Sequence, residues 1–207
     1  ILKGAAMAFE GGWTRVKLYF MLGLPTETEE DIRGIAELCN KIAATFFETV
    51  PKEKRTGQIQ IVASTSFFIP KPFTPFQWAA MNTAEEFLDK ARLTRQAVHE
   101  QLNQKRIKYN WHEADVSVME GVFARGDRRL SRVIRMAYER GCIYDSWGEH
   151  FHNDIWMDCF EKCGLDVGFY TTRERSLDEI FPWDFLDCGV TKEFLKREWQ
   201  RALDGVV

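Results

Sequence analysis

The chain has 207 residues, of which 45% are hydrophobic, including 16 Phe and 7 Trp, and this is enough apolar material for a substantial core. Its 28 basic and 31 acidic residues give a formal net charge of −3, which disfavours general binding to a nucleic-acid backbone. No apolar run approaches the roughly 20 residues of a membrane span, and no secretory leader pattern is visible at the start. We therefore expect a globular, cytoplasmic protein.

The strongest local pattern in the first third is a strand between two helices. Residues 5–9 read as the end of a helix closed by Gly11–Gly12. Residues 16–22 form a continuous apolar and aromatic run, which predicts a central strand buried on both faces. Thr28 stands three residues before Asp31, the spacing of a capping box, and apolar residues then recur at helical intervals at positions 32, 35, 36, 39, 42, 43 and 46.

A second strand completes a parallel strand-helix-strand unit. Residues 58–69 are rich in Ile, Val, Thr, Ser and Phe, a composition typical of strands. Such units build doubly wound sheets or closed barrels. In both, the ligand sits at the carboxyl ends of the strands, which here are residues 23–27 and 70–78.

Helices dominate the rest of the sequence. Thr83 and Glu86 form another capping box at the start of a helix, and residues 107–111 could be a short closing strand. Beyond them, helices are predicted at residues 116–124, 127–140, 154–162 and 191–203. We place a boundary near residue 112, which separates residues 1–111 from a mainly helical region, residues 112–207.

The five cysteines, at positions 39, 142, 159, 163 and 188, are scattered and odd in number, so we expect reduced thiols. Cys159 and Cys163 lie four residues apart, and on one helix face they could share a metal or be oxidised together. Both also fall on an apolar stripe with Trp156 and Phe160. Because a buried cysteine behaves as a small hydrophobe, a core position is the favoured interpretation.

Five segments of the sequence carry a resemblance to a known family. The run YFMLGLPTETEED, together with the later SFFIPKPFTPFQW, resembles the later half of the catalytic barrel of radical S-adenosylmethionine (radical SAM) enzymes, most closely the cobalamin-binding type. The tail segments FARGDRRLSRVI, GCIYDSWGEHF and TTRERSLDEIFPWDFLDCGVTKEFLKREWQ are similar to the carboxyl-terminal extension of an uncharacterised subgroup. The resemblance implies an α/β fold: the last parallel strands of a (βα) TIM-type barrel, followed by a mainly helical region.

The sequence also departs from this family. The cluster-binding motif CxxxCxxC is absent, and so is the Asp-x-His-x-x-Gly loop that ligates cobalt in many cobalamin domains. The chain opens at Ile1 without an initiator Met, so we interpret it as a piece of a longer polypeptide. We expect S-adenosylmethionine, the [4Fe-4S] cluster and possible cobalamin to act in the parent, with the cluster ligands in its missing N-terminal part. The isolated fragment is expected to be inactive.

The resemblance also implies site residues at the strand ends. The cofactor-binding candidates are Met21, Gly23, Leu24, Phe67, Phe68 and Pro70. The alternative is that the large side chains are barrel core and that Gly23 only shapes the turn. Candidates for substrate binding are Lys71, which could meet an anionic group on the cofactor or substrate, Gln77, and Trp78, which could cover the cavity. A solvated lysine is the competing interpretation of Lys71.

One further residue and two groups of residues each have two interpretations. Glu27 could serve as an acid or base, although an acidic residue beside a helix N-terminus is favoured electrostatically there. A dense group of potential metal ligands consists of Glu149, His150, His152 and Asp154. These residues could bind a divalent metal ion or form a packed junction. The packed junction is favoured, so no metal site is predicted. A basic run predicts a solvated helix face or, less favoured, a docking surface for an acidic partner or RNA: Arg125, Arg128, Arg129, Arg132 and Arg135.

The sequence therefore leaves two functional hypotheses. The parent could be a radical enzyme that cleaves S-adenosylmethionine reductively and abstracts hydrogen from, or transfers a methyl group to, an unknown substrate. Alternatively, the segment is a non-catalytic binding module that recruits RNA, protein or another partner. No catalytic residue is identified in this chain. We also expect the fragment to form a homodimer through the sheet edge that the missing strands would leave open.

Overall fold

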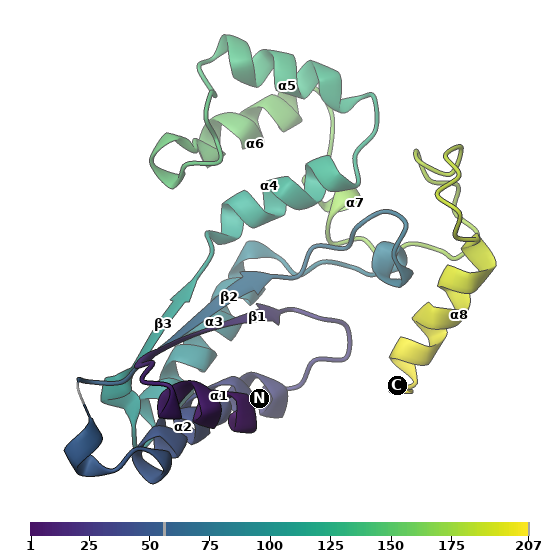
Figure 1. The fold of residues 1–207 in the computed structure, drawn as a ribbon. Helices are drawn as coiled ribbons and strands as arrows, with labels where there is room; N and C mark the ends of the chain where they lie inside the picture. Colours follow the sequence, from purple (N-terminus) through teal and green to yellow (C-terminus); the bar gives the residue numbers. More distant parts are fainter. Residues whose placement is uncertain (56, 207) are drawn as a thin grey trace. The chain divides into compact units, whose positions relative to one another are not determined.

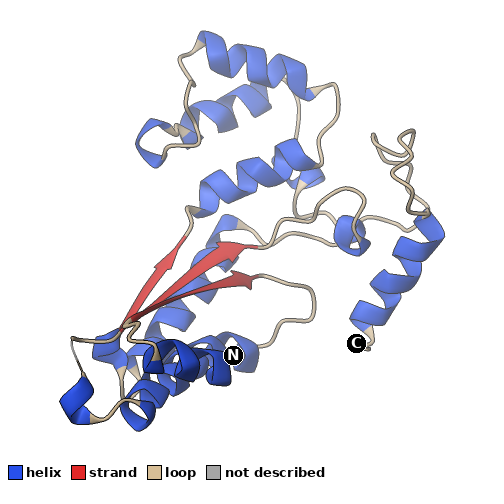
Figure 2. Cartoon of the chain, viewed as in Figure 1, coloured by secondary structure: helices blue, strands red, loops and turns tan. Residues whose placement is uncertain are grey.

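The computed structural model describes residues 1–55 and 57–206 (Figure 1). Contacts divide the chain into two compact units. The sheet unit comprises Ile1–Phe67 and Phe87–His112, and the helical unit comprises Phe68–Glu86 and Glu113–Val207. The loop that follows the second strand therefore belongs with the helical tail. All strands of the described residues lie in the sheet unit, and helices supply most of the other regular structure (Figure 2).

The sheet unit contains a three-stranded parallel sheet in the order β1-β2-β3. Arg15 pairs with Gln60, and Ile61 pairs with Ile107, so the strands start nearly level with one another. The α/β class and the parallel strand-helix-strand pattern are thereby confirmed. The strands are β1 (Arg15–Leu22), β2 (Gln60–Phe67) and β3 (Ile107–Trp111).

Three α-helices pack on one face of this sheet (Figure 1). They are α1 (Leu2–Glu10), α2 (Glu29–Thr49) and α3 (Ala84–His99), and the short helices η1 (Lys52–Lys54) and η3 (Gln104–Arg106) complete the unit. The helix-facing side of the sheet supplies a continuous apolar layer: Val16, Leu18, Phe20, Ile61, Ala63, Ile107 and Tyr109.

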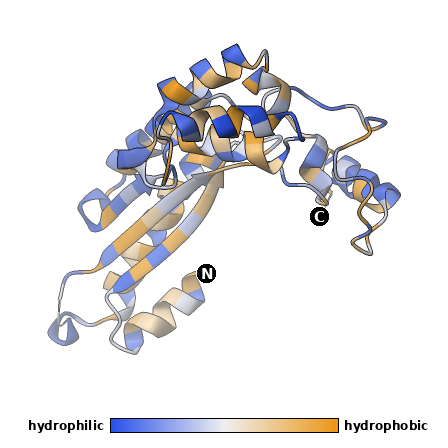
Figure 3. Ribbon diagram, turned by 90° about the horizontal axis from the view of Figure 1, so that it is seen from above, coloured by the Kyte–Doolittle hydropathy of each residue, from blue (hydrophilic) through white to orange (hydrophobic). Residues whose placement is uncertain are grey.

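The opposite face of the sheet is not covered by a helix of this unit, and its side chains are exposed or partly exposed. We call it the open face. It carries Arg15, Lys17, Tyr19, Met21, Gln60, Val62, Ser64, Ser66, Lys108 and Asn110. Strand β1 alternates between exposed and covered residues, and in Figure 3 orange and blue alternate along the strands. The expectation that residues 16–22 are buried on both faces is therefore wrong. β1 is an edge strand, paired only with β2 among the described residues.

Local signals account for the helix that follows β1. Asp31 N donates to Thr28 Oγ1, and Thr28 N donates to Asp31 Oδ2, so the predicted capping box is present. All seven apolar positions expected to face the core are buried. The capping box of Thr83 and Glu86 before α3 is also present. These starts and faces are confirmed because they depend on residues close in sequence.

The described residues of the helical unit form more than one apolar core. One is centred on residues such as Val122, Val133 and Phe160, and another on Trp78, Phe181 and neighbouring aromatic residues. The predicted helices are confirmed, although α5 starts later than expected. The helical elements are η2 (Pro75–Trp78), α4 (Ala114–Ala124), α5 (Leu130–Glu139), η4 (Gly148–His150), α6 (Asn153–Lys162), α7 (Val167–Tyr170) and α8 (Lys192–Leu203).

The late start of α5 has a local cause. Asp127 Oδ1 accepts the backbone N–H of Arg129 at 2.8 Å, which forms a tight turn in place of a first helical turn. None of the helices within residues 1–55 and 57–206 combines the length and the hydropathy of a membrane-spanning segment.

Candidate functional site

The turn after β1 lies at the carboxyl end of the strand, where parallel α/β folds place their ligands. Gly23 has φ of +89°, a conformation that suits glycine, and Thr26 has φ of +66°. Glu27 N donates to Leu24 O at 3.1 Å and closes the turn. The backbone here is therefore held in a defined, partly strained shape.

Glu27 ties this turn to α3. Its Oε2 accepts the N–H of Gly23 at 2.9 Å, and its Oε1 lies 2.6 Å from Nζ of Lys90. The Glu27 side chain is only 6% exposed, so the carboxylate is buried and its charge is balanced by the lysine. The expected role at the helix N-terminus belongs instead to Thr28 and Asp31. Sequence reasoning missed Lys90, because no local pattern marks a lysine 63 residues away as the partner of Glu27.

A pocket of about 420 Å³ opens beside this turn. Met21, which is 44% exposed, and Leu24, which is 39% exposed, present apolar surface to it, and Glu27 lines its polar side. Its lining comes from the end of β1, the turn and the first turns of α2: Phe20, Met21, Leu24, Pro25, Thr26, Glu27, Asp31, Ile32 and Ile35. Two of the six cofactor-binding candidates, Met21 and Leu24, thus line this pocket, and Gly23 lies between them in the turn, where it is buried.

The other three candidates are core residues. Phe67 faces the helices and stacks on Phe87 with ring centroids 4.5 Å apart. Phe68 lies in the helical unit, where it packs edge-to-face on Phe76, and Pro70 is buried in the same unit. In these positions their side chains contribute to packing.

The residues expected to bind substrate, Lys71, Gln77 and Trp78, all contact other residues of the helical unit. Lys71 Nζ lies 2.6 Å from Glu120 Oε1, so its charge already has a partner. Gln77 is buried and accepts the N–H of Trp183 at 2.9 Å. Trp78 is 1% exposed and packs on Phe181. Both Gln77 and Trp78 therefore serve as core residues.

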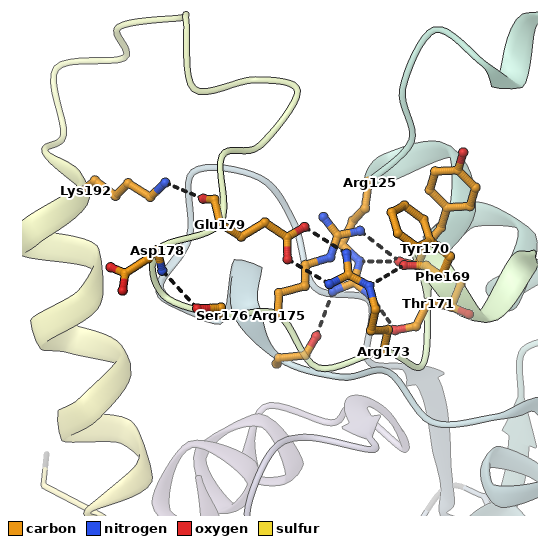
Figure 4. A network of polar contacts seen from close by, with 11 residues as sticks. Arg125, Phe169, Tyr170, Thr171, Arg173, Arg175, Ser176, Asp178, Glu179 and Lys192 are labelled. Carbon is orange, nitrogen blue, oxygen red and sulfur yellow. Dashed lines mark hydrogen bonds and ion pairs between the residues drawn. The ribbon is translucent and has the colours of Figure 1, made fainter.

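Arg125 is a buried arginine of the helical unit, with a relative exposure of 1%. Figure 4 shows the polar contacts that surround it. The interpretation of Arg125 as part of a solvated helix face is wrong. Its guanidinium donates to three backbone carbonyls: Tyr170 O at 2.9 Å, Ala79 O at 2.7 Å and Thr171 O. Burial lowers the pKa of Arg125 to about 9, with a further lowering from the positive charges of Arg175 and Arg173.

Two more arginines complete this network. Arg173 forms a bidentate ion pair with Glu179, with both N–O distances 2.8 Å, and this pair lowers the pKa of the Glu179 carboxyl. Arg175 is buried and lies over the rings of Phe181 and Trp183. The segment TTRERSLDEIFPW therefore acts as the polar and aromatic centre of the helical unit.

The rest of the basic run is on the surface. Arg129 pairs with Asp127, and Arg135 pairs with Glu139 on α5. Arg128 and Arg132 are exposed. For these four residues the structure agrees with a solvated face.

The His-rich segment and the cysteines give no ligand cluster. Among the described residues, no group of three or more His, Cys, Asp and Glu side chains is arranged to hold a metal ion. Cys159 is buried in the first core, Cys163 is half-buried, and none of the five cysteines is in a disulfide. Burial raises the pKa of the Cys142 thiol, as expected for an unreactive core cysteine.

Comparison with known proteins gives one informative relationship. Over 159 residues, which are 77% of this chain, the sequence is 32% identical to the uncharacterized protein MJ0966 of Methanocaldococcus jannaschii. The aligned stretch is 32% of that protein, so the chain spans roughly a third of the length of this relative. No family model matches the chain, and no solved structure matches it.

Proposed function

We propose that this chain is the later part of the catalytic barrel of a cytoplasmic radical S-adenosylmethionine enzyme, with the helical unit as its extension. The observation that carries the proposal is the parallel sheet with helices on one face and an open face opposite. A doubly wound sheet carries helices on both faces, whereas a barrel wall has its helices outside and its other face toward the interior. The one-sided packing favours the barrel.

The pocket at the carboxyl end of β1 suits the nucleoside part of S-adenosylmethionine. Met21 and Leu24 offer apolar contact to a nucleoside, and Gly23, with its positive φ, shapes the buried turn between them. The buried pair of Glu27 and Lys90 fixes the shape of the turn that presents these residues. We limit the proposed S-adenosylmethionine contacts in this chain to Met21 and Leu24, with Gly23 shaping the turn that presents them.

The residues of this chain do not fit a [4Fe-4S] cluster. Its five cysteines do not include a CxxxCxxC motif, and the described residues hold no cluster of metal ligands. In the proposal the [4Fe-4S] cluster, and cobalamin if it is used, are held elsewhere in the parent. When bound there, the cluster would supply the electron for reductive cleavage of S-adenosylmethionine, and the residues of this chain would bind, orient and shield the cofactor.

Two matched glycine variants of the full-length parent test the site. Gly23 and Gly141 both have positive φ, +89° and +93°, so Ala strains the backbone similarly at each. We expect Gly23→Ala to weaken binding of labelled S-adenosylmethionine by about tenfold or more, and Gly141→Ala to change it by less than about twofold, as measured by equilibrium dialysis of the cluster-loaded protein. Equal affinities for Gly23→Ala and the wild type would count against the site.

A further inference from the structure

The opposite end of the sheet has an unusual concentration of positive charge. At the amino ends of the strands, Arg15 stands at the start of β1, Lys105 and Arg106 lie in η3, and Lys108 is the second residue of β3. These four residues line one pocket of about 330 Å³, and no carboxylate lines it. This arrangement contrasts with the formal net charge of −3 for the whole chain.

Sheet register brings the cations together. Arg15 pairs with Gln60 on β2, and Val62 on the same face of β2 pairs with Lys108 on β3. Neighbouring strands lie about 4.8 Å apart, so cations from β1 and β3 flank the central strand. Among the described residues, none of the four cations has a salt bridge.

The rest of the pocket is lined by neutral residues, both polar and apolar: Thr14, Gln58, Ile59, Gln60 and Ile107. Arg106 Nη1 donates to Gln58 Oε1 at 2.6 Å, which orients the guanidinium and leaves its other N–H groups available. Thr14 and Gln60 add further hydrogen-bonding groups. Several cations with neutral donors and no carboxylate form the kind of donor set that recognises phosphate oxygens.

We propose that this pocket binds a small phosphate-bearing ligand at the amino ends of the strands. The proposal is independent of the S-adenosylmethionine site, which lies at the carboxyl ends. A small ligand is favoured over a nucleic acid because the four cations converge on one pocket and the negative net charge of the chain repels an extended polyanion.

Calorimetric titration of the chain with inorganic pyrophosphate at low ionic strength tests the proposal. We expect saturable binding with one site per chain, weakened by added salt. The double variant Lys105→Ala/Lys108→Ala should lose affinity by about 100-fold, since each of the two charged hydrogen bonds to phosphate is worth roughly a factor of ten. Arg15→Gln should give a loss of about tenfold and keeps a polar side chain on the open face.

The matched control is Lys3→Ala/Lys41→Ala, which removes the same charge from exposed positions on α1 and α2. It should retain the wild-type affinity within about twofold, and far-UV circular dichroism should show that all variants are folded. Three results would overturn the proposal: no saturable binding by the folded wild type, an equal loss in the control, or tight binding of single-stranded RNA without binding of pyrophosphate.

Discussion

Replacement of Arg125 by Met tests the account of the helical unit most sharply. The variant keeps a long, largely apolar side chain at a position that is 1% exposed, but it removes every hydrogen bond of the guanidinium. Tyr170 O also accepts from Arg175, and Thr171 O also accepts from the backbone of Met81, so both keep a donor. Ala79 O loses the donor that the described structure gives it.

The lost hydrogen bonds determine how much the Arg125→Met change lowers the free energy of unfolding. One buried carbonyl without a partner costs roughly 1–3 kcal/mol, and the loss of two further hydrogen bonds from a charged donor adds to this. Removal of a buried charge offsets part of the cost, because burial disfavours the charged form of Arg125. We expect a net loss of about 2–4 kcal/mol in the free energy of unfolding of the helical unit.

Urea denaturation followed by tryptophan fluorescence measures this loss, since Trp78, Trp183 and Trp199 are buried in the helical unit. The control is Arg132→Met, which changes an exposed arginine on α5 and should alter the free energy of unfolding by less than about 0.5 kcal/mol. An Arg125→Met protein as stable as the wild type, or an equally destabilised control, would show that these hydrogen bonds do not stabilise the helical unit.

Three further predictions concern stability. Lys90→Met leaves the buried carboxylate of Glu27 without its cation and should cost about 2–4 kcal/mol, measured by urea denaturation. Phe87→Ala removes a fully buried ring that stacks in the sheet-unit core and should cost about 3–5 kcal/mol in the same assay. Arg173 lowers the pKa of Glu179, so this pair contributes fully above the ordinary carboxyl value of 4.5 and its contribution is lost as the pH falls through the lowered pKa. Glu179→Gln should therefore reduce the acid-induced loss of stability below pH 4.5, measured by denaturation at several pH values.

Each of these predictions has its own contrary result. A Lys90→Met protein of unchanged stability would mean that the carboxylate is not desolvated. A small effect of Phe87→Ala would contradict the packing of α3 on the sheet. If the wild type and Glu179→Gln lose stability equally on acidification, the bidentate pair does not hold the carboxylate in its charged form.

The elements of the fold could be predicted where the determining residues are close in sequence. Thr28 and Asp31 cap α2 within three residues, and the helical spacing of its apolar residues identifies the buried face. The parallel sheet follows from the alternation of strands and helices. The sequence wrongly predicts burial of the second face of β1, because Tyr19 and Met21 are apolar enough to suit a core, although the structure places them on the open face.

The site was predictable only in part, for a similar reason. Met21, Gly23 and Leu24 gather because they belong to one strand end and its turn. Arg125 looks like one member of a surface run, yet carbonyls 45 and 46 residues away surround it. No periodicity within the run distinguishes this buried arginine from its exposed neighbours.

The most direct test of the proposed function uses the full-length parent, purified without oxygen and reconstituted with iron and sulfide. S-adenosylmethionine and a strong reductant are added, and 5′-deoxyadenosine is quantified against a control that lacks the cluster. The proposed function predicts 5′-deoxyadenosine well above the control. Absence of this product from protein with a fully assembled cluster would contradict it.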